Sequence, residues 1–325
     1  MRRRVVPADF WPWLYFDNPA GDALAVVAFH GPRPVGRFEC VPVRLVVDGA
    51  AQTAYLLQGL TLAPGFRQWA HLRGLLSAAQ QAPSRVDPVF SFGFTTPAGT
   101  RLHASLGLPV LGRVSMFAAA LDGAALLRSR GLPSALSAFA GPLTGALMRW
   151  KQARPNAAVA VGEIEAFTSD FDDLATPPSA PGSIGLLKDA AYLDWRYVRR
   201  PGACYHRLIA SRSGQPAGLL VWRADIGTCD GYLLELAARD DDPATLDALL
   251  EAACEQMRSA RVGLVAASFP RGSTAARALT RAGFTGLYTR WKKMSLAYVP
   301  GREGEDQAGM SLAHWSYSLG DWLYH

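Results

Sequence analysis

The chain matches itself at a fixed offset, and this internal repeat restricts its possible folds more than any other feature. Sparse aromatic, proline and glycine positions recur 182 residues later: Trp13, Tyr15, Pro19, Pro34 and Gly36 match Trp195, Tyr197, Pro201, Pro216 and Gly218. Further along, Tyr55-Leu56-Leu57 matches Tyr232-Leu233-Leu234 at an offset of 177, and Leu106-Gly107-Leu108 matches Ala282-Gly283-Phe284 at 176. A shared order of such positions over about 95 residues indicates one fold used twice.

The length and composition of the chain agree with two copies. Its 325 residues are 50% apolar and 18% charged, which gives enough apolar material for two cores of about 130 to 150 residues each. We expect a first domain at 1–122, a helical linker at 123–155, a second domain at 156–299 and an aromatic tail at 300–325. The tail is too aromatic to be solvated, so it should pack back onto a domain.

The cysteines and the N-terminus bear on location. None of the four cysteines, Cys40, Cys204, Cys229 and Cys254, has C-x-x-C spacing. The first residues are arginines followed by prolines and an aspartate rather than an apolar signal core. These features predict a reduced, cytoplasmic protein with buried thiols and no metal site.

Charge is unequal between the halves. Residues 1–160 hold 16 lysines and arginines against 7 aspartates and glutamates, whereas the remainder holds 17 against 20. The first half therefore suits an anionic ligand better than the second, although scattered solvated arginines would give the same count.

Each copy predicts the same series of elements. An aromatic entry segment precedes an antiparallel meander, whose strands in the first copy run from Ala23 to Phe29, Val35 to Val47 and Thr53 to Leu62. A helix, a buried strand, a short helix and a further strand follow. This order predicts an α+β fold in each copy, a mixed and mostly antiparallel sheet flanked by helices, rather than a Rossmann alternation.

The segment between the copies has two interpretations. Residues 131–148 hold no charge but are rich in glycine, proline and small polar residues. We expect a helical linker packed between the domains; peripheral membrane contact through 131–148 is the second possibility.

The segment from Leu60 to Leu76 carries the clearest chemistry. A strand turns through Pro64-Gly65 into the start of a helix, a geometry that aims free backbone N–H groups and the positive end of the helix dipole at one point. Such a turn holds a phosphate or pyrophosphate. Arg67 and Arg73 add positive charge at the same place.

At this segment the chain resembles the GNAT superfamily of acyl-CoA-dependent N-acyltransferases. Its signature is a strand followed by Arg/Gln-x-x-Gly-x-Gly/Ala opening a helix, and Arg67 to Leu72 take that register. The resemblance covers both copies and implies tandem domains with acetyl-CoA or another acyl-CoA as co-substrate. The residues it implies for binding are Leu62, Arg67, Gln68, Trp69, Ala70, His71, Leu72 and Arg73.

Two positions depart from the family signature. Ala70 and Leu72 replace its glycines, so side chains stand where bare backbone approaches the pyrophosphate. Leu72 is compatible with binding if its side chain points into the core. In the second copy the same stretch carries Asp240-Asp241-Asp242, which would repel a pyrophosphate; we expect this copy to be degenerate and not to bind CoA.

The resemblance also suggests catalytic residues. In the family an amine attacks the thioester directly while an acid, often a tyrosine on the terminal helix, protonates the leaving thiolate. His103 takes that tyrosine's place here, and Leu279 takes it in the second copy. Glu39 and Gln58 are the polar candidates on the acceptor side, Glu39 as general base.

We therefore expect acyl transfer to a small-molecule amine, such as an amino-sugar or polysaccharide precursor or an amino acid, and no DNA partner. One alternative is a catalytically inactive protein that keeps the double fold as a binding or scaffold module. Another is an aminoacyl transferase resembling the FemABX group, which would hold charged tRNA on its basic half.

Overall fold

The computed structural model describes residues 7–82, 90–123, 159–175, 181–225, 227–286, 294–300 and 311–323. The segment 131–148, and all but the first residue of the expected linker at 123–155, lie outside these ranges.

The described elements follow the predicted order in both copies. The first copy contains α1 (Phe10–Tyr15), β1 (Leu24–His30), β2 (Arg33–Val47), β3 (Ala50–Leu62), α2 (Trp69–Gln81), β4 (Phe90–Thr95), α3 (Pro97–Ser105), β5 (Val110–Arg113) and β6 (Met116–Ala120). The second contains β7 (Ala160–Glu163), β8 (Ile184–Leu186), α6 (Ala190–Tyr197), β9 (His206–Arg212), β10 (Gln215–Asp225), β11 (Asp230–Ala238), α7 (Pro243–Ser259), β12 (Leu264–Ser268), α8 (Thr274–Arg281) and β13 (Ser295–Pro300). Short 3-10 turns lie at Ser169–Phe171, Arg239–Asp241, Leu312–His314 and Leu319–Asp321, and the tail adds β14 (Trp315–Ser316).

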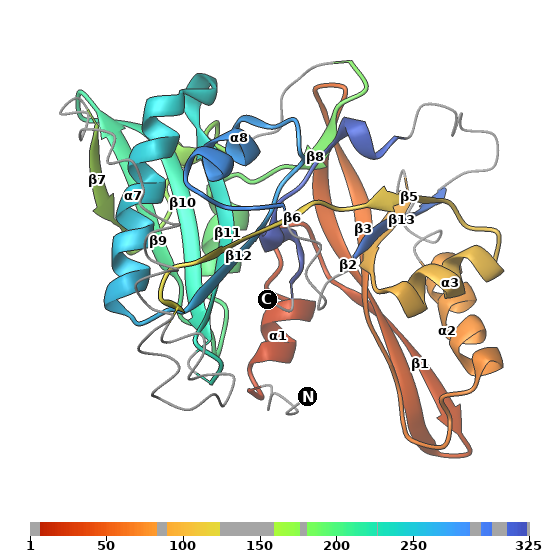
Figure 1. Ribbon diagram of the computed structural model, residues 1–325. Helices are drawn as coiled ribbons and strands as arrows, with labels where there is room; N and C mark the ends of the chain where they lie inside the picture. The colour runs from red at the N-terminus through yellow and green to blue at the C-terminus, as the bar shows by residue number, and fades with distance from the viewer. Residues whose placement is uncertain are drawn as a thin grey trace, which may run out of the picture.

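These strands form two mixed sheets, which confirms the α+β prediction (Figure 1). One has the order β14-β8-β2-β3-β4-β13-β5 with β1 paired to β2, and the other has the order β6-β12-β11-β10-β9-β7. Most pairings are antiparallel, and in each copy the meander's last strand pairs in parallel with the next strand, β3 with β4 and β11 with β12. Helix α7 covers one face of the second sheet, and α2 and α3 lie beside the first.

The repeated tryptophans form a symmetric pair between the copies. Trp13 and Trp195 stack with ring centroids 4.6 Å apart. Each indole N–H donates to the other residue's carbonyl, at 2.8 Å from Trp13 and 3.0 Å from Trp195. Both side chains are buried. The offset of 182 therefore corresponds to a structural relation in which equivalent residues meet between the two copies.

The repeated glycines have a packing reason. A Cβ on Gly36 would lie 2.4 Å from a methyl of Leu62, and one on Gly218 would lie 2.7 Å from a methyl of Thr245. In both copies the second meander strand passes close beneath the helix that follows the meander, and glycine provides the room.

The copies exchange their last strands, which the sequence did not predict. Strand β6 of the first half pairs with β12 in the second sheet, and β13 of the second half lies between β4 and β5 in the first. Each sheet therefore contains strands from both of the expected ranges, 1–122 and 156–299. An exchanged strand makes the same antiparallel hydrogen bonds as an unexchanged one, so local sequence carries no signal for the choice.

The tail packs back into the molecule, as expected. Trp315, Tyr317, Leu319 and Trp322 are buried, and the Trp322 ring lies 4.6 Å from that of Phe94. Together with α1 and α6, the tail belongs to a core cluster that joins both sheets.

The cysteines require a correction. Cys40 and Cys254 are buried, but Cys204 is exposed and Cys229 is half-buried. Only two of the four thiols are therefore sequestered. Burial, with the Glu39 charge adding to it, raises the pKa of the Cys40 thiol to about 12, which makes this thiol unreactive.

Candidate functional site

The candidate site lies where β3 and β4 separate. The two strands pair only at Tyr55–Ser91 and Leu56–Phe92. They come close once more at Gly93, where a Cβ would stand 2.6 Å from the carbonyl oxygen of Leu57. Beyond that point the register of β3 against β2 shifts by one residue near Gly59, whose φ is +70°. This bulge bends β3 and opens a gap between strands that would otherwise stay paired.

The gap holds a cavity of about 320 Å³. Its walls are mainly apolar, and its polar side chains come from the bulge and from the start and end of α3. It is lined by Phe38, Leu57, Gln58, Gly59, Leu60, Trp69, Leu72, Gly93, Phe94, Thr95, Thr96, Ala98, Gly99, Leu102 and His103. Such a cavity suits a mostly apolar ligand with a few polar groups.

The strand-to-helix turn predicted for phosphate binding forms beside this cavity. Gly65 has a φ of +89°, and the N–H of Phe66 donates to the Ala63 carbonyl at 3.0 Å. Helix α2 begins after Gln68, whose side chain makes no capping hydrogen bond, and no acidic residue lies in the first turn. The N–H groups of that turn are therefore left for solvent or for an anion.

The predicted binding residues take different positions around the turn. Arg67 is anchored, because its Nε donates to the Leu62 carbonyl at 3.1 Å. Gln68, Ala70 and Arg73 are exposed. Leu62 is buried and does not line the cavity.

The remaining residues at the start of α2 have definite partners. Leu72 is half-buried and packs on the apolar cluster beneath the cavity, as its side chain must for the turn to bind a ligand. Trp69 is 45% exposed at the cavity's edge. The Nδ1 of His71 lies 3.0 Å from the Phe66 carbonyl oxygen, so this imidazole holds the turn.

His103 lines the cavity but is not poised as an acid. Its side chain is only 5% exposed, and its Nδ1 makes no hydrogen bond within the described chain. Burial lowers the pKa of this imidazole to about 4, so it is neutral at pH 7. A neutral imidazole donates one hydrogen bond and accepts another.

Gln58 and Glu39 are brought together, but only Gln58 faces the cavity. They are opposite each other in the β2–β3 register. The Glu39 carboxylate is fully buried, lies 3.2 Å from Arg37 Nε, and fits against the bare Cα of Gly59. Glu39 is not among the residues lining the cavity. The expected general base is therefore part of the bulge's support.

Comparison with known proteins gives a fold and no close relative. No family model matches the chain, and no curated protein matches it. Among solved structures, a tandem GNAT protein from the clavulanic acid biosynthesis pathway aligns over 88% of this chain and 85% of its own, with a TM-score of 0.55 and 13% identity. N-myristoyltransferase from Saccharomyces cerevisiae, solved with bound myristoyl-CoA, aligns over 91% and 70%, with a TM-score of 0.59 and 11% identity.

The chain has a tandem GNAT fold. A probable N-acyltransferase from Enterococcus faecalis also aligns, with a TM-score of 0.51 and 9% identity; 86% of this chain covers 60% of that longer one. At these identities the comparison establishes the fold alone, so the chemistry of the site depends on the residues described above.

The second GNAT copy differs at the equivalent turn. The Asp242 carboxylate accepts from the N–H of Thr245 at 3.0 Å and caps α7. Asp240 and Asp241 precede it with φ near +50°. The N-terminus of α7 is thus already neutralised by the chain's own carboxylate, whereas that of α2 is not.

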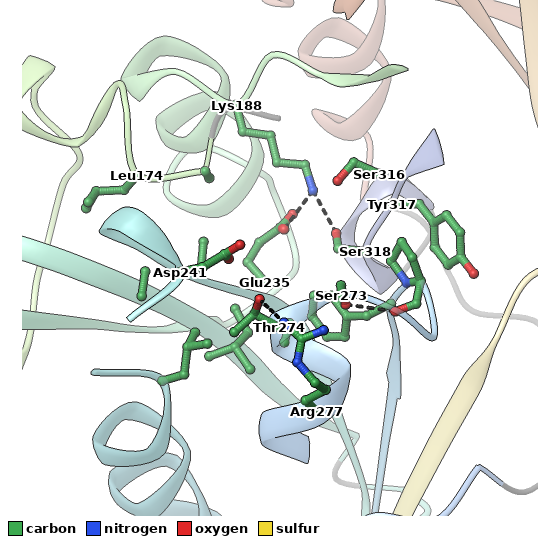
Figure 2. A pocket seen from close by; sticks show the side chains of 18 of the residues that line it. Leu174, Lys188, Glu235, Asp241, Ser273, Thr274, Arg277, Ser316, Tyr317 and Ser318 are labelled. Atoms are coloured by element: carbon green, nitrogen blue, oxygen red, sulfur yellow. Dashed lines mark hydrogen bonds and ion pairs between the residues drawn. The ribbon is translucent and has the colours of Figure 1, made fainter. Parts of the chain in front are cut away.

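A buried ionic cluster in the second copy was missed by sequence reasoning (Figure 2). Lys188 Nζ lies 2.7 Å from Glu235 and 2.7 Å from Asp321, and Tyr197 OH donates to Glu235 at 2.6 Å. One signal was present, because Glu235 stands at offset 177 from Gln58. Lys188 and Asp321 have no counterpart in the repeat that would have marked them.

In the described part of the chain, no helix is long and apolar enough to cross a membrane.

Proposed function

We propose that the N-terminal GNAT copy binds an acyl-CoA between β3 and β4 and transfers its acyl group to an amine. The observation that carries the proposal is the uncapped first turn of α2, set between two arginines and beside an apolar cavity. The turn would hold the pyrophosphate through its N–H groups, with Arg67 and Arg73 adding positive charge. The cavity would hold the pantetheine arm and the acyl group.

The reaction needs a nucleophile with a free electron pair and a route for two protons. The amine nitrogen attacks the thioester carbonyl carbon, the C–N bond forms, and the C–S bond breaks. The proton lost by the amine must pass to a base or to solvent, and the leaving thiolate must gain one. Because His103 is neutral, we assign it a hydrogen bond to the reacting groups rather than proton donation as an imidazolium. Gln58, on the bulge, would orient the acceptor.

The acceptor is proposed as a small-molecule amine, with an amino sugar, a polysaccharide precursor or an amino acid as the classes to screen. We propose a cytoplasmic location as well, since the reaction needs access to acyl-CoA.

The test is a calorimetric titration of acetyl-CoA and longer acyl-CoAs into the wild type and into an Arg67→Ala/Arg73→Ala double variant. We expect micromolar binding by the wild type and at least about a tenfold loss in the variant. Arg73→Ala alone separates charge from loop geometry, because Arg73 is exposed while Arg67 anchors the turn.

Arg239→Ala is the matched control. Arg239 lies in the equivalent loop of the second copy, so its loss should leave acyl-CoA affinity unchanged. If Arg239→Ala abolished binding and the double variant did not, the donor site would belong to the second copy.

Two outcomes would favour the alternatives. Acyl-CoA binding without turnover against any amine would indicate an inactive binding or scaffold protein, an interpretation that the missing family glycines and the missing tyrosine support. Absence of acyl-CoA binding together with salt-sensitive binding of charged tRNA would indicate an aminoacyl transferase.

A further inference from the structure

The second GNAT copy keeps a cavity at the equivalent place, and its chemistry differs from that of the first. Strands β11 and β12 pair only from Asp230–Leu264 to Leu233–Ala267. Beyond them lies a cavity of about 330 Å³. Its walls come from β11, the turn before α7, the start of α8, the tail and the end of β8 with the segment that follows it. Figure 2 shows polar and charged side chains converging on it from these elements.

Lys188, the buried cation in this cavity, already uses all three of its N–H donors within the protein. Lys188 Nζ has three N–H donors. Its three partners are Glu235 at 2.7 Å, Asp321 at 2.7 Å and the Ser318 hydroxyl at 2.8 Å. All four side chains are at least nine-tenths buried. The cluster is therefore a fixed part of the wall in which one ammonium faces two carboxylates.

The groups that remain available are mostly acceptors. Among the residues that the structure describes, each oxygen of the Glu235 carboxylate receives one hydrogen bond, from Tyr197 or from Lys188, and a carboxylate oxygen accepts two. Asp241 adds a second carboxylate at the exposed edge. The Ser316 hydroxyl points toward the same end of the cavity as Lys188 in Figure 2.

Three arginines lie near the cavity. Arg271 is exposed between the lining residues Pro270 and Gly272 but does not itself line the cavity; its charge acts on the lining Tyr317. Arg277 lines the far wall, where it is exposed and donates to the Gly272 carbonyl at 2.6 Å and the Thr274 hydroxyl at 2.7 Å. Arg196 is buried behind the tail and does not line the cavity. It donates to the carbonyls of Gly320 and Trp322 and to a tyrosine hydroxyl. These hydrogen bonds direct the guanidinium groups of Arg277 and Arg196 to carbonyl and hydroxyl oxygens.

We infer that the cavity between β11 and β12 is a binding site for a primary ammonium compound, with Glu235 as its buried acceptor and Asp241 as the acceptor at its mouth. The groups lining the cavity carry two positive charges, on Lys188 and Arg277, against the two carboxylates. Asp321 lies directly behind Lys188 and leaves the cluster one negative charge in excess. An ammonium group supplies both the charge and the N–H donors that these acceptors lack.

The turn before α7 argues against an anion in the same cavity. Asp242 caps α7, and Asp240 and Asp241 stand beside it, so the N-terminus of α7 is not offered to a phosphate. The start of α8 also lines the cavity, and there the Ser273 hydroxyl caps the helix by accepting from the Ala276 N–H at 3.1 Å. The cavity of the first copy thus lies beside a turn that suits an anion. The equivalent cavity of the second copy lies beside carboxylates that suit a cation. This inference does not depend on acyl transfer, because its test contains no acyl-CoA.

The test uses 1,4-diaminobutane as the probe, titrated calorimetrically into the full chain at pH 7 and low salt. 1,4-Butanediol has the same length without charge, and inorganic phosphate is the anionic comparison. We expect the diamine to bind and the diol and phosphate not to. Glu235→Gln should weaken binding of the diamine at least about tenfold, because a hydrogen bond between two charged groups is lost. This variant installs the residue that the first copy has at the equivalent place, Gln58.

A pair of exposed aspartates provides the control that is independent of folding. Asp241 lines the cavity and its neighbour Asp240 does not, and both are exposed with left-handed backbone that asparagine tolerates. Asp241→Asn should weaken binding of the diamine about threefold to fivefold, and Asp240→Asn should leave the affinity unchanged. The inference is overturned if the diol binds as well as the diamine, if phosphate binds in its place, or if the two asparagine variants behave alike.

Discussion

Two independent constraints at the residue scale hold Gly59 in place. Its φ of +70° lies in the left-handed region, which costs an alanine roughly 1 to 2 kcal/mol. A Cβ there would also collide with a carboxylate oxygen of Glu39, a fully buried side chain that lies 3.2 Å from Arg37 Nε. The β3 bulge, and the cavity that depends on it, therefore require a glycine at this position.

We predict that Gly59→Ala lowers the free energy of unfolding by about 3 kcal/mol, measured by urea denaturation. Gly65→Ala is the control, because Gly65 also has a positive φ but a Cβ added there would have nothing within 4 Å. It should show the backbone cost alone. Equal losses in the two variants would mean that the Glu39 contact contributes nothing.

His103 makes a second residue-scale prediction, about pH. Its pKa is about 4 in the folded protein and about 6.5 in an unfolded chain. Between these values the unfolded state binds more protons, so stability rises with pH and is lost as pH falls from about 6.5 to about 4. The full loss is about 3 kcal/mol.

The measurement is the unfolding free energy of the wild type and of His103→Asn at pH 7 and at pH 4.5. The wild type should lose more stability than the variant, since other groups titrate alike in both. An NMR titration gives a direct check. The chemical shifts of the His103 ring protons should show the imidazole to be predominantly neutral above pH 5. A midpoint near 6.5 would contradict the burial described here.

The two equivalent helices differ at the element scale in how they begin. Helix α7 starts with the Asp242 cap, and α2 starts after an uncapped Gln68. A capping side chain stabilises a helix by about 1 kcal/mol. A helix that forgoes this gain keeps its first N–H groups available to a ligand, so stability and anion binding compete at the same atoms.

Installing a cap on α2 should therefore separate the two effects. We predict that Gln68→Asp stabilises the protein by about 1 kcal/mol. The same variant should weaken acyl-CoA binding at least about fivefold, because the new carboxylate repels the pyrophosphate and occupies the N–H donors. Gln68→Asn caps without charge and should stabilise similarly with a smaller loss of affinity. Undiminished acyl-CoA binding by Gln68→Asp would place the pyrophosphate elsewhere.

Element order could be predicted from the sequence because it depends on local signals. Alternating apolar residues gave the strands, and Asp48-Gly49 gave the hairpin between β2 and β3. The strand-to-helix turn with Arg67 was also local. The cluster of Lys188, Glu235 and Asp321 was not, since its members lie on three segments far apart in the sequence, and Asp321 reaches the cluster only because the tail packs back.

Strand exchange makes the two copies one folding unit at the scale of the whole molecule. Strand β6 completes the second sheet and β13 completes the first, and the Trp13–Trp195 stack joins the copies at their centre. Neither copy keeps its sheet intact if the other unfolds. The repeat predicted two copies, but which sheet receives each last strand is a tertiary choice that the repeat does not encode.

A defect placed in one copy should therefore weaken both. Gly36→Ala puts a methyl group 2.4 Å from Leu62 and 2.9 Å from Leu75, an overpacking that costs about 1 to 3 kcal/mol. Native-state hydrogen exchange should show equal loss of protection in β4 of the first sheet and in β12 of the second. The mirror variant Gly218→Ala, made in the second copy, should give the same pattern. If each variant lowered protection only in its own sheet, the exchanged strands would not couple the copies; equal loss in both sheets would establish one cooperative unit in which the two cavities share a single stability.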